Sequence, residues 1–182
     1  MPDYSIHIET PRLILREIQP GDEIPFFEMD SNPEVHRYLG NNPVKTIEDT
    51  RESIARIRQQ YIDFGIGRWA MIEKETGAFT GWTGLKWVTD PANGYNEYPD
   101  IGYRIKPEFW GKGYATESSI AARDYAFNVL KYPVLYGTAH IDNIASQTVL
   151  KKIGLSFVNI FDRNDMKIHW YELPREKWET LK

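Results

Sequence analysis

Two glycines flank a lysine in residues 110–115, where Gly111, Lys112 and Gly113 stand between an apolar segment and the start of a helical pattern. Glycine lets backbone N–H groups converge because no Cβ stands in the way, and a helix start adds about half a positive charge. The pattern predicts a cradle for an anion, most naturally a phosphate group. A tight strand-to-helix turn is the alternative, and it explains one glycine better than two glycines around a lysine.

Two familiar phosphate motifs do not fit this segment. A Walker loop requires Ser or Thr after the lysine and a glycine five residues before Gly111, but Gly113 and Lys106 stand there. A dinucleotide fingerprint would place Gly or Ala at position 116, where the chain has Thr116. Nucleoside-triphosphate hydrolysis and dinucleotide binding are therefore disfavoured.

The elements that position this loop mix strands and helices, and no repeat or linker divides residues 1–182. We expect one mixed α/β (α+β) domain with a strand–loop–helix–strand crossover after residue 101. Strands are expected at 12–18, 69–73, 79–88, 101–105 and 134–139, with two more around the turn 162–165. Helical segments are expected at 22–31, 33–39, from Thr46 to Gly65, at 114–130, and at 143–153 before Gly154. On the helix 114–130, small residues and a valine share one face, namely Ala115, Ser119, Ala122, Ala126 and Val129.

Composition excludes several classes of protein. The chain has 182 residues, 22 Lys and Arg, 26 Asp and Glu and a net charge of −4, which disfavours nucleic-acid binding. Without cysteine it has no disulfide and no thiolate nucleophile, and its four histidines lack the spacing of a helical metal motif, so no metal is expected. No apolar run is long enough for a membrane span, and Asp3 stands where a secretory signal would carry basic residues. We expect a cytoplasmic protein.

Charge is divided unevenly along the chain. Residues 1–100 carry 10 basic and 17 acidic side chains, whereas residues 101–182 carry 12 basic and 9 acidic ones. The predicted anion cradle lies in the basic part, so we expect the acidic part to supply the binding side for a cation. Chance placement of solvated charges is the alternative explanation.

Several segments together resemble the GNAT superfamily of N-acetyltransferases. They are the strand 100–105, the loop 110–115, the helical segment 143–146 with 150–154, and the opening 9–16. More narrowly, they resemble its Rim-type branch, which acetylates the N-terminal α-amine of ribosomal proteins. Trp110 departs from the pattern, because many members have Gln or Arg at that position; since the loop binds mostly through backbone groups, we expect a change in packing more than in binding.

The resemblance implies a splayed, mostly antiparallel sheet flanked by helices, with acetyl-CoA as co-substrate in the gap. By position, the backbone of Ile105 would pair with the pantetheine arm, and Asn143 and Ser146 would face the pantetheine and the sulfur. The pyrophosphate would be held by the loop and helix start, namely Gly111, Lys112, Gly113, Tyr114, Ala115 and Thr116. No metal is implied, and the protein would be a monomer or a homodimer.

Acetyl transfer requires a neutral amine and a proton for the departing thiolate. An α-amino group, with a reference pKa of about 7.7–8.0, needs less help from a base than a lysine at about 10.4. Asp100 precedes Ile-Gly-Tyr, where the family often has an acid, so we expect it to act as the base through water, or else to attract a cationic substrate. Glu97 and His140 are weaker candidates.

Ser146 is the acid expected from the family position, with a capping or packing serine as the alternative. Trp82, Trp87 and Tyr103 are candidates for the walls of the acceptor site. The main hypothesis is thus an acetyl-CoA-dependent N-acetyltransferase that acts on a primary amine, with a protein N-terminal α-amine ahead of a small-molecule amine. A non-catalytic acyl-CoA-binding module is the rival.

Overall fold

The computed structural model describes residues 7–181, so residues 1–6 and 182 of the predicted domain 1–182 lie outside the described residues. The described strands form one eight-stranded sheet in the order β1-β2-β3-β4-β5-β6-β8-β7. Their bounds are β1 His7–Glu9, β2 Leu13–Glu17, β3 Arg68–Glu73, β4 Phe79–Val88, β5 Tyr98–Ile105, β6 Val134–His140, β7 Ser156–Arg163 and β8 Met166–Pro174. All neighbours are antiparallel except β5 and β6. The predicted mixed, mostly antiparallel fold class is confirmed.

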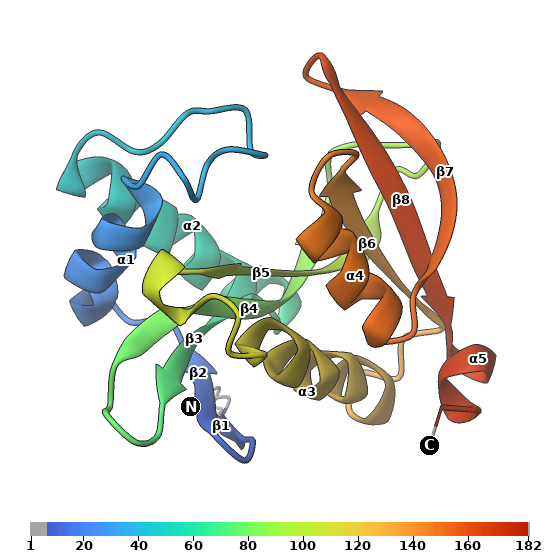
Figure 1. Ribbon diagram of the computed structural model, residues 1–182. Coiled ribbons are helices and arrows are strands. Elements are labelled where there is room, and N and C mark those ends of the chain that lie inside the picture. The colour runs from blue at the N-terminus through green and yellow to red at the C-terminus, as the bar shows by residue number, and fades with distance from the viewer. Residues whose placement is uncertain (1–6, 182) are drawn as a thin grey trace.

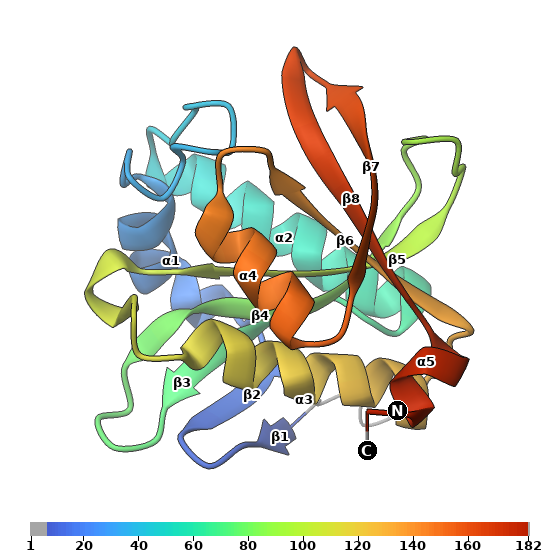
Figure 2. The ribbon, with the colours of Figure 1, turned by 45° about the vertical axis from the view of Figure 1, so that its right-hand side comes forward.

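Helices cover both faces of this sheet. Their bounds are α1 Glu23–Asp30, α2 Ile47–Phe64, α3 Tyr114–Asn128, α4 Ile144–Lys152 and α5 Arg175–Glu179. In Figures 1 and 2, α3 and α4 lie in front of the sheet and α1 and α2 lie behind it. Within residues 7–181, none of these helices combines the length and apolar character that a membrane span requires.

The long helix α2 forms where the sequence predicts it. The Thr46 side chain accepts from the backbone N–H of Asp49, whose carboxylate accepts from the N–H of Thr46, and Gly65 ends the helix in a left-handed conformation. Ile54 and Tyr61 are buried on its inner face. Burial of such a face, rather than helix propensity, supplies most of a helix's stability in a folded protein.

The expected helical segment at 33–39 is wrong. Those residues form a chain of turns, in which His36 N–H donates to the carbonyl of Pro33 and Leu39 N–H donates to that of His36. The Asn32 side chain accepts from Glu34 N–H, as at a helix start, but the backbone N–H groups of the segment donate three residues back, as in successive turns. Gly40, in the left-handed region, then ends it before a stable helical nucleus can form. This turn segment faces the candidate site.

Helix α3 packs its small side chains closely on the sheet. Ser119, Ala122 and Ala126 are buried, and Ala122 and Ala126 belong to the core cluster that includes Trp69 and Leu85. Val129, expected on the same face, is the C-cap residue and is 57% exposed. The close approach fixes the start of α3 beside the ends of β4 and β5, where the loop 110–113 must turn.

The sheet splays between its two parallel strands. Asp100 and Tyr136 are the single pair of register partners between β5 and β6. Beyond that pair, the edge of β5 from Ile101 to Ile105 has no strand partner among the described residues. The sheet therefore has two arms, β1–β5 and β6–β8–β7, which diverge in Figure 1. An unpaired strand edge carries N–H and C=O groups that a ligand can bind.

Candidate active site

A cleft of about 1020 Å³ occupies the splay between β5 and β6. It is lined by parts of the turn segment 34–39, the strand 101–105, the loop and helix start 109–116, the segment 138–152 and the hairpin 163–168. Pockets for small molecules commonly measure about 300–1,000 Å³. The cleft is therefore large enough for an extended ligand.

The glycine loop has the geometry of an anion cradle. Gly111 and Gly113 adopt φ values of +74° and +81°, in the region that favours glycine. Gly113 is the N-cap of α3 and no side chain caps that helix end. The first backbone N–H groups of a helix have no partners within it, so those at Tyr114, Ala115 and Thr116 are available to an anion. These residues fit the pyrophosphate role that the resemblance implies.

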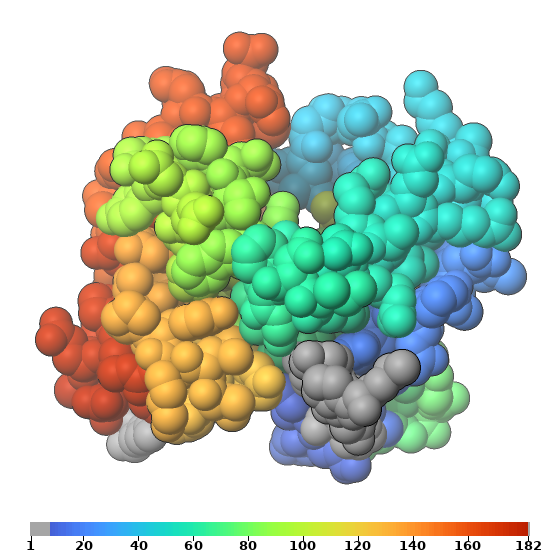
Figure 3. Space-filling model, turned by 180° about the vertical axis from the view of Figure 1, so that it is seen from behind, coloured from blue at the N-terminus to red at the C-terminus, as the bar shows by residue number. Residues whose placement is uncertain are grey.

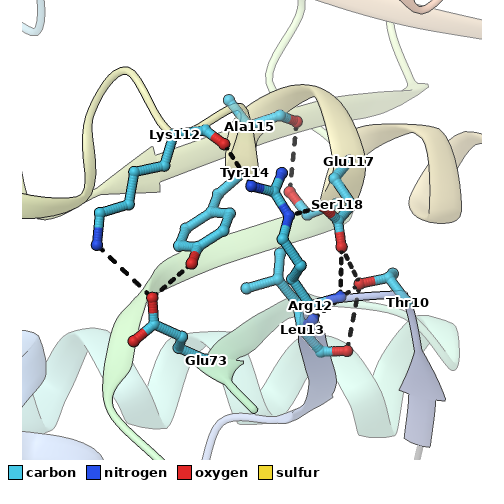
Figure 4. Close-up of polar contacts among 9 residues, drawn as sticks. All are labelled: Thr10, Arg12, Leu13, Glu73, Lys112, Tyr114, Ala115, Glu117 and Ser118. Atoms are coloured by element: carbon cyan, nitrogen blue, oxygen red, sulfur yellow. Dashed lines mark hydrogen bonds and ion pairs between the residues drawn. The ribbon is translucent and has the colours of Figure 1, made fainter. Parts of the chain in front are cut away.

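Three polar side chains, Thr10, Arg12 and Glu117, hold the loop from below, as Figure 4 shows, and we call them the brace. Arg12 donates from Nη1 to the carbonyl of Lys112 at 2.7 Å and from Nε to Glu117 at 2.7 Å. The Glu117 carboxylate also accepts from the Thr10 hydroxyl at 2.6 Å. Burial alone would raise the pKa of Glu117, but these hydrogen bonds outweigh it and lower that pKa. The turn between β1 and β2 thus fixes the loop and the first turn of α3 together.

The Lys112 side chain points toward Glu73, beneath the loop, and does not line the cleft. Its Nζ lies 3.7 Å from Glu73 Oε1, and Tyr114 donates its hydroxyl to the same carboxylate. Hydrogen bonds from Thr76 and then Tyr114 lower the pKa of Glu73, while burial opposes them. Lys112 therefore contributes to the loop through its backbone and through the charge it adds beneath it.

Trp110, the departure from the family pattern, ties the loop back to the strand edge. Its Nε1 donates to the carbonyl of Ile105 at 2.8 Å, although the side chain is 49% exposed. Ile105 is the residue whose backbone was expected to meet the pantetheine arm. A carbonyl has two lone pairs, so this bond leaves one acceptor site on Ile105.

Asn143 and Ser146 meet at the start of α4. The Asn143 side chain is the N-cap and accepts from the Ser146 N–H at 3.1 Å. Both residues line the cleft. Tyr103, from β5, also lines it: burial raises the pKa of Tyr103, and a hydrogen bond with the Ser146 side chain acts in the opposite direction. No local sequence signal predicts this Tyr103–Ser146 contact, because only tertiary structure brings β5 and α4 together.

Asp100 lies apart from this group. Its carboxylate pairs with Arg68, whose Nη1 also donates to the carbonyls of Gly84 at 2.6 Å and of Asp100 itself at 3.2 Å. Side chains alternate along a strand, so Asp100 points to the opposite face of β5 from Tyr103. Asp100 does not line the cleft. Its role as a base stays a prediction, and Glu97 is exposed beyond the start of β5.

The turn segment 33–39 and the hairpin of β7 and β8 line one part of the cleft, which we call the acceptor end because we expect the amine there. Tyr38 and His140 meet across it with ring centroids 5.6 Å apart. His140 Nδ1 accepts from the Asp142 N–H at 3.1 Å, so a neutral ring carries its proton on Nε2. Trp82 and Trp87, which were expected as walls, are not among the lining residues, whereas Tyr103 is.

The first hundred residues contribute the turn segment to the cleft lining, but few of their acidic side chains. Among the described residues, Glu34 is the only acid that lines it, alongside Arg37, Arg104, Lys152 and Arg163. Other acids of the first hundred residues are engaged elsewhere, such as Asp100. The described residues also contain no group of three or more His, Cys, Asp or Glu side chains that could hold a metal ion.

The sheet splays at an unpaired strand edge, and this edge leads to a glycine loop and an uncapped helix start. This arrangement suits an extended acyl carrier that contains a pyrophosphate. Comparison with known proteins identifies the family. The family described as "Acetyltransferase (GNAT) domain" matches residues 12–156. This chain therefore belongs to the GNAT acetyltransferase family and is an N-acetyltransferase, of the acyltransferase class. Enzymes of this family use acetyl-CoA as acyl donor.

Individual relatives agree with this assignment. The uncharacterized N-acetyltransferase YoaA of Bacillus subtilis (strain 168) is 31% identical over 147 residues, which cover 81% of each chain. The structure of a GNAT-family acetyltransferase from Bacillus anthracis has a TM-score of 0.77 at 22% identity and covers 94% of this chain and 99% of its own. That of the ribosomal-protein-S5-alanine acetyltransferase from Vibrio fischeri has a TM-score of 0.75 at 12% identity, with 95% and 98% covered. At these identities the two structures establish a shared fold.

Proposed function

We propose that this N-acetyltransferase acetylates an α-amino group, with the N terminus of a protein as the preferred acceptor, as in the Rim-type branch. The carrying observation is the cleft itself, which joins a phosphate cradle to a wide acceptor end with a single acidic residue, Glu34, in its described lining. A lysine-type amine is about one part in a thousand neutral near pH 7.4, whereas an α-amine is roughly a fifth neutral. A cleft with so little base capacity suits the α-amine.

The amine would attack the thioester carbonyl directly, forming the C–N bond while the C–S bond breaks. Acetyl-CoA would lie along the unpaired edge of β5, with its pyrophosphate at the loop 111–113 and the start of α3. Ser146 would give a proton to the departing thiolate, and Tyr103 would orient the Ser146 hydroxyl. Asp100 remains our candidate for the base, acting through water.

A small-molecule amine is the second candidate, and polar side chains in the cleft lining, such as Glu34 and His140, favour it. The deciding experiment measures thiol release from acetyl-CoA with a panel of peptides, amino acids and polyamines. We expect peptides with a free N terminus to accelerate release most. Preference for polyamines or lysine side chains would contradict the proposal. If no amine accelerates thiol release, the result would contradict N-acetyltransferase activity itself.

Intact-mass analysis of a cell extract, incubated with the protein and labelled acetyl-CoA, then identifies the natural acceptor. A labelled protein N terminus supports the Rim-type assignment. Label confined to small molecules would favour the second candidate.

A further inference from the structure

The charges at the acceptor end of the cleft do not all balance within the protein. Arg104 pairs with Asp30 at 2.8 Å, and its partner is buried. Glu34 and Arg37 lie three residues apart on the turn segment and carry opposite charges. Arg163, on the opposite side of the cleft at the end of β7, has no carboxylate of the described residues within 4 Å. Arg37 and Lys152 also line the cleft with no carboxylate of the described residues within 4 Å, and Arg163 is the unpaired cation on the hairpin side.

The Arg163 guanidinium is held in place at this end of the cleft. Its Nη2 donates to the hydroxyl of Tyr98 at 3.0 Å, and the group lies over the ring of Phe161 at 5.1 Å. Tyr98 is itself buried in an aromatic cluster with Trp170. A guanidinium has five N–H donors in a planar fork, and the one described hydrogen bond leaves most of them available. A fixed, half-buried and unneutralised guanidinium is a receptor for a carboxylate.

The acceptor end is open to solvent on the side away from the glycine loop. Figure 3, seen from behind, shows a hollow bordered by the yellow-green segment near residues 90–98 and the cyan segment near residues 40–60. The hairpin that carries Arg163 stands above this hollow in the same view. Arg163 and Ser146 line the same cleft, so a substrate bound in it can meet both side chains.

We propose that Arg163 binds a carboxylate of the acceptor, so that the substrate is an amine that also carries a negative charge. This inference rests on the proposed function and narrows its substrate class. The carboxylate belongs either to an acidic side chain near a peptide N terminus or to a free amino acid. Polycationic amines would be poor acceptors because they place a like charge beside Arg163.

The test compares matched acceptors. For a peptide source, the probes are alanyl-glutamyl-alanine amide, its glutaminyl counterpart and its lysyl counterpart; for an amino-acid source, they are methionine and methioninamide. We expect the wild-type kcat/KM to be about tenfold higher for the acidic member of one set. In Arg163→Met that preference should fall to about one, mainly through KM, while coenzyme A affinity is unchanged.

The matched control is Lys167→Met on the same hairpin. Lys167 pairs with Asp162 at 2.7 Å and is 58% exposed, so its loss changes the net charge equally without touching the cleft lining. The control should keep the acidic preference. If Arg163→Met keeps it too, with a thermal midpoint near that of wild type, the inference is overturned. Should Arg163→Met unfold, Arg163→Gln, which keeps hydrogen-bond donors but removes the charge, serves in its place, and an unchanged preference there again overturns the inference. Absence of acetylation with every probe would instead count against the proposed function.

Discussion

Replacement of Asp100 by Asn separates the two roles that this carboxylate can have. Asp100 and Arg68 are 14% and 12% exposed, so the pair is largely removed from water. Gly102 contributes to this geometry: a Cβ at that position would lie 2.9 Å from Arg68 Nη2. Asn keeps the shape and one acceptor atom but removes the charge that faces the guanidinium. If the pair is structural, the main loss is in stability.

The expected loss follows from the burial of the pair. Breaking a buried ion pair by removing one partner costs about 3–5 kcal/mol. Arg68 keeps its bonds to the carbonyls of Gly84 and residue 100, so we expect the lower end, about 3 kcal/mol of unfolding free energy. For a domain of this size, each kcal/mol lowers Tm by about 2–4 °C, so Tm should fall by about 6–12 °C.

Urea unfolding of wild type, Asp100→Asn, Arg68→Met and the double variant gives the coupling energy, which should exceed about 1 kcal/mol. The exposed pair of Asp162 and Lys167 provides the matched cycle, with an expected coupling below about 1 kcal/mol. The kinetic measurement is kcat on fully folded protein at low temperature. Arg68→Met breaks the same pair but keeps the carboxylate.

The structural role is refuted, and the base role proposed above is supported, if Asp100→Asn keeps its stability and kcat drops by about 100-fold, the size of a lost general base. It is also refuted if Arg68→Met retains kcat while Asp100→Asn loses it, because the carboxylate would then act directly. Equal, small effects of both variants on kcat, with a large loss of stability, support the structural role.

Three further predictions concern the loop and Ser146. Gly113→Ala should cost about 1–2 kcal/mol of unfolding free energy because position 113 has a positive φ. It should also weaken coenzyme A binding, measured by calorimetry. The control is Gly65→Ala, at a position with a similar φ and open space around it, which should affect stability alone. The pKa of Glu117 is lower in the folded protein than the unfolded value of about 4.3. Its contribution to stability is therefore complete above that unfolded pKa and is lost as the pH falls through the folded pKa. Glu117→Gln should flatten the acid limb of a pH–stability curve. Ser146→Ala should lower kcat by about 100-fold without changing the Kd for coenzyme A, whereas an unchanged kcat would leave Ser146 a packing residue.

The fold was largely predictable where local signals act alone. Thr46 and Asp49 cap α2 as their spacing predicts, and the glycine loop turns between β5 and α3 as expected. The segment 33–39 was predicted as a helix, but Gly40 ends it early and its backbone bonds are those of successive turns.

The site was less predictable because its partners are distant in sequence. Nothing local to Asp100 indicates that Arg68, on β3, reaches it across β4. The contact between Tyr103 and Ser146 likewise depends on the packing of α4 beside β5. Sequence motifs located the backbone cradle well, since it depends on consecutive residues. They located side-chain chemistry poorly, since it depends on which strand face each residue occupies.

The brace beneath the glycine loop also bears on how the protein acquires its binding capacity. Arg12 and Glu117 are 105 positions apart, yet their contact fixes the loop. Contacts of such high sequence separation form late in folding because long chain closures are costly in entropy. Coenzyme A should therefore bind only molecules in which the turn between β1 and β2 has already packed against the start of α3. The ligand would then shift the folding equilibrium by mass action, and its binding would report complete assembly of the chain rather than local order at the loop.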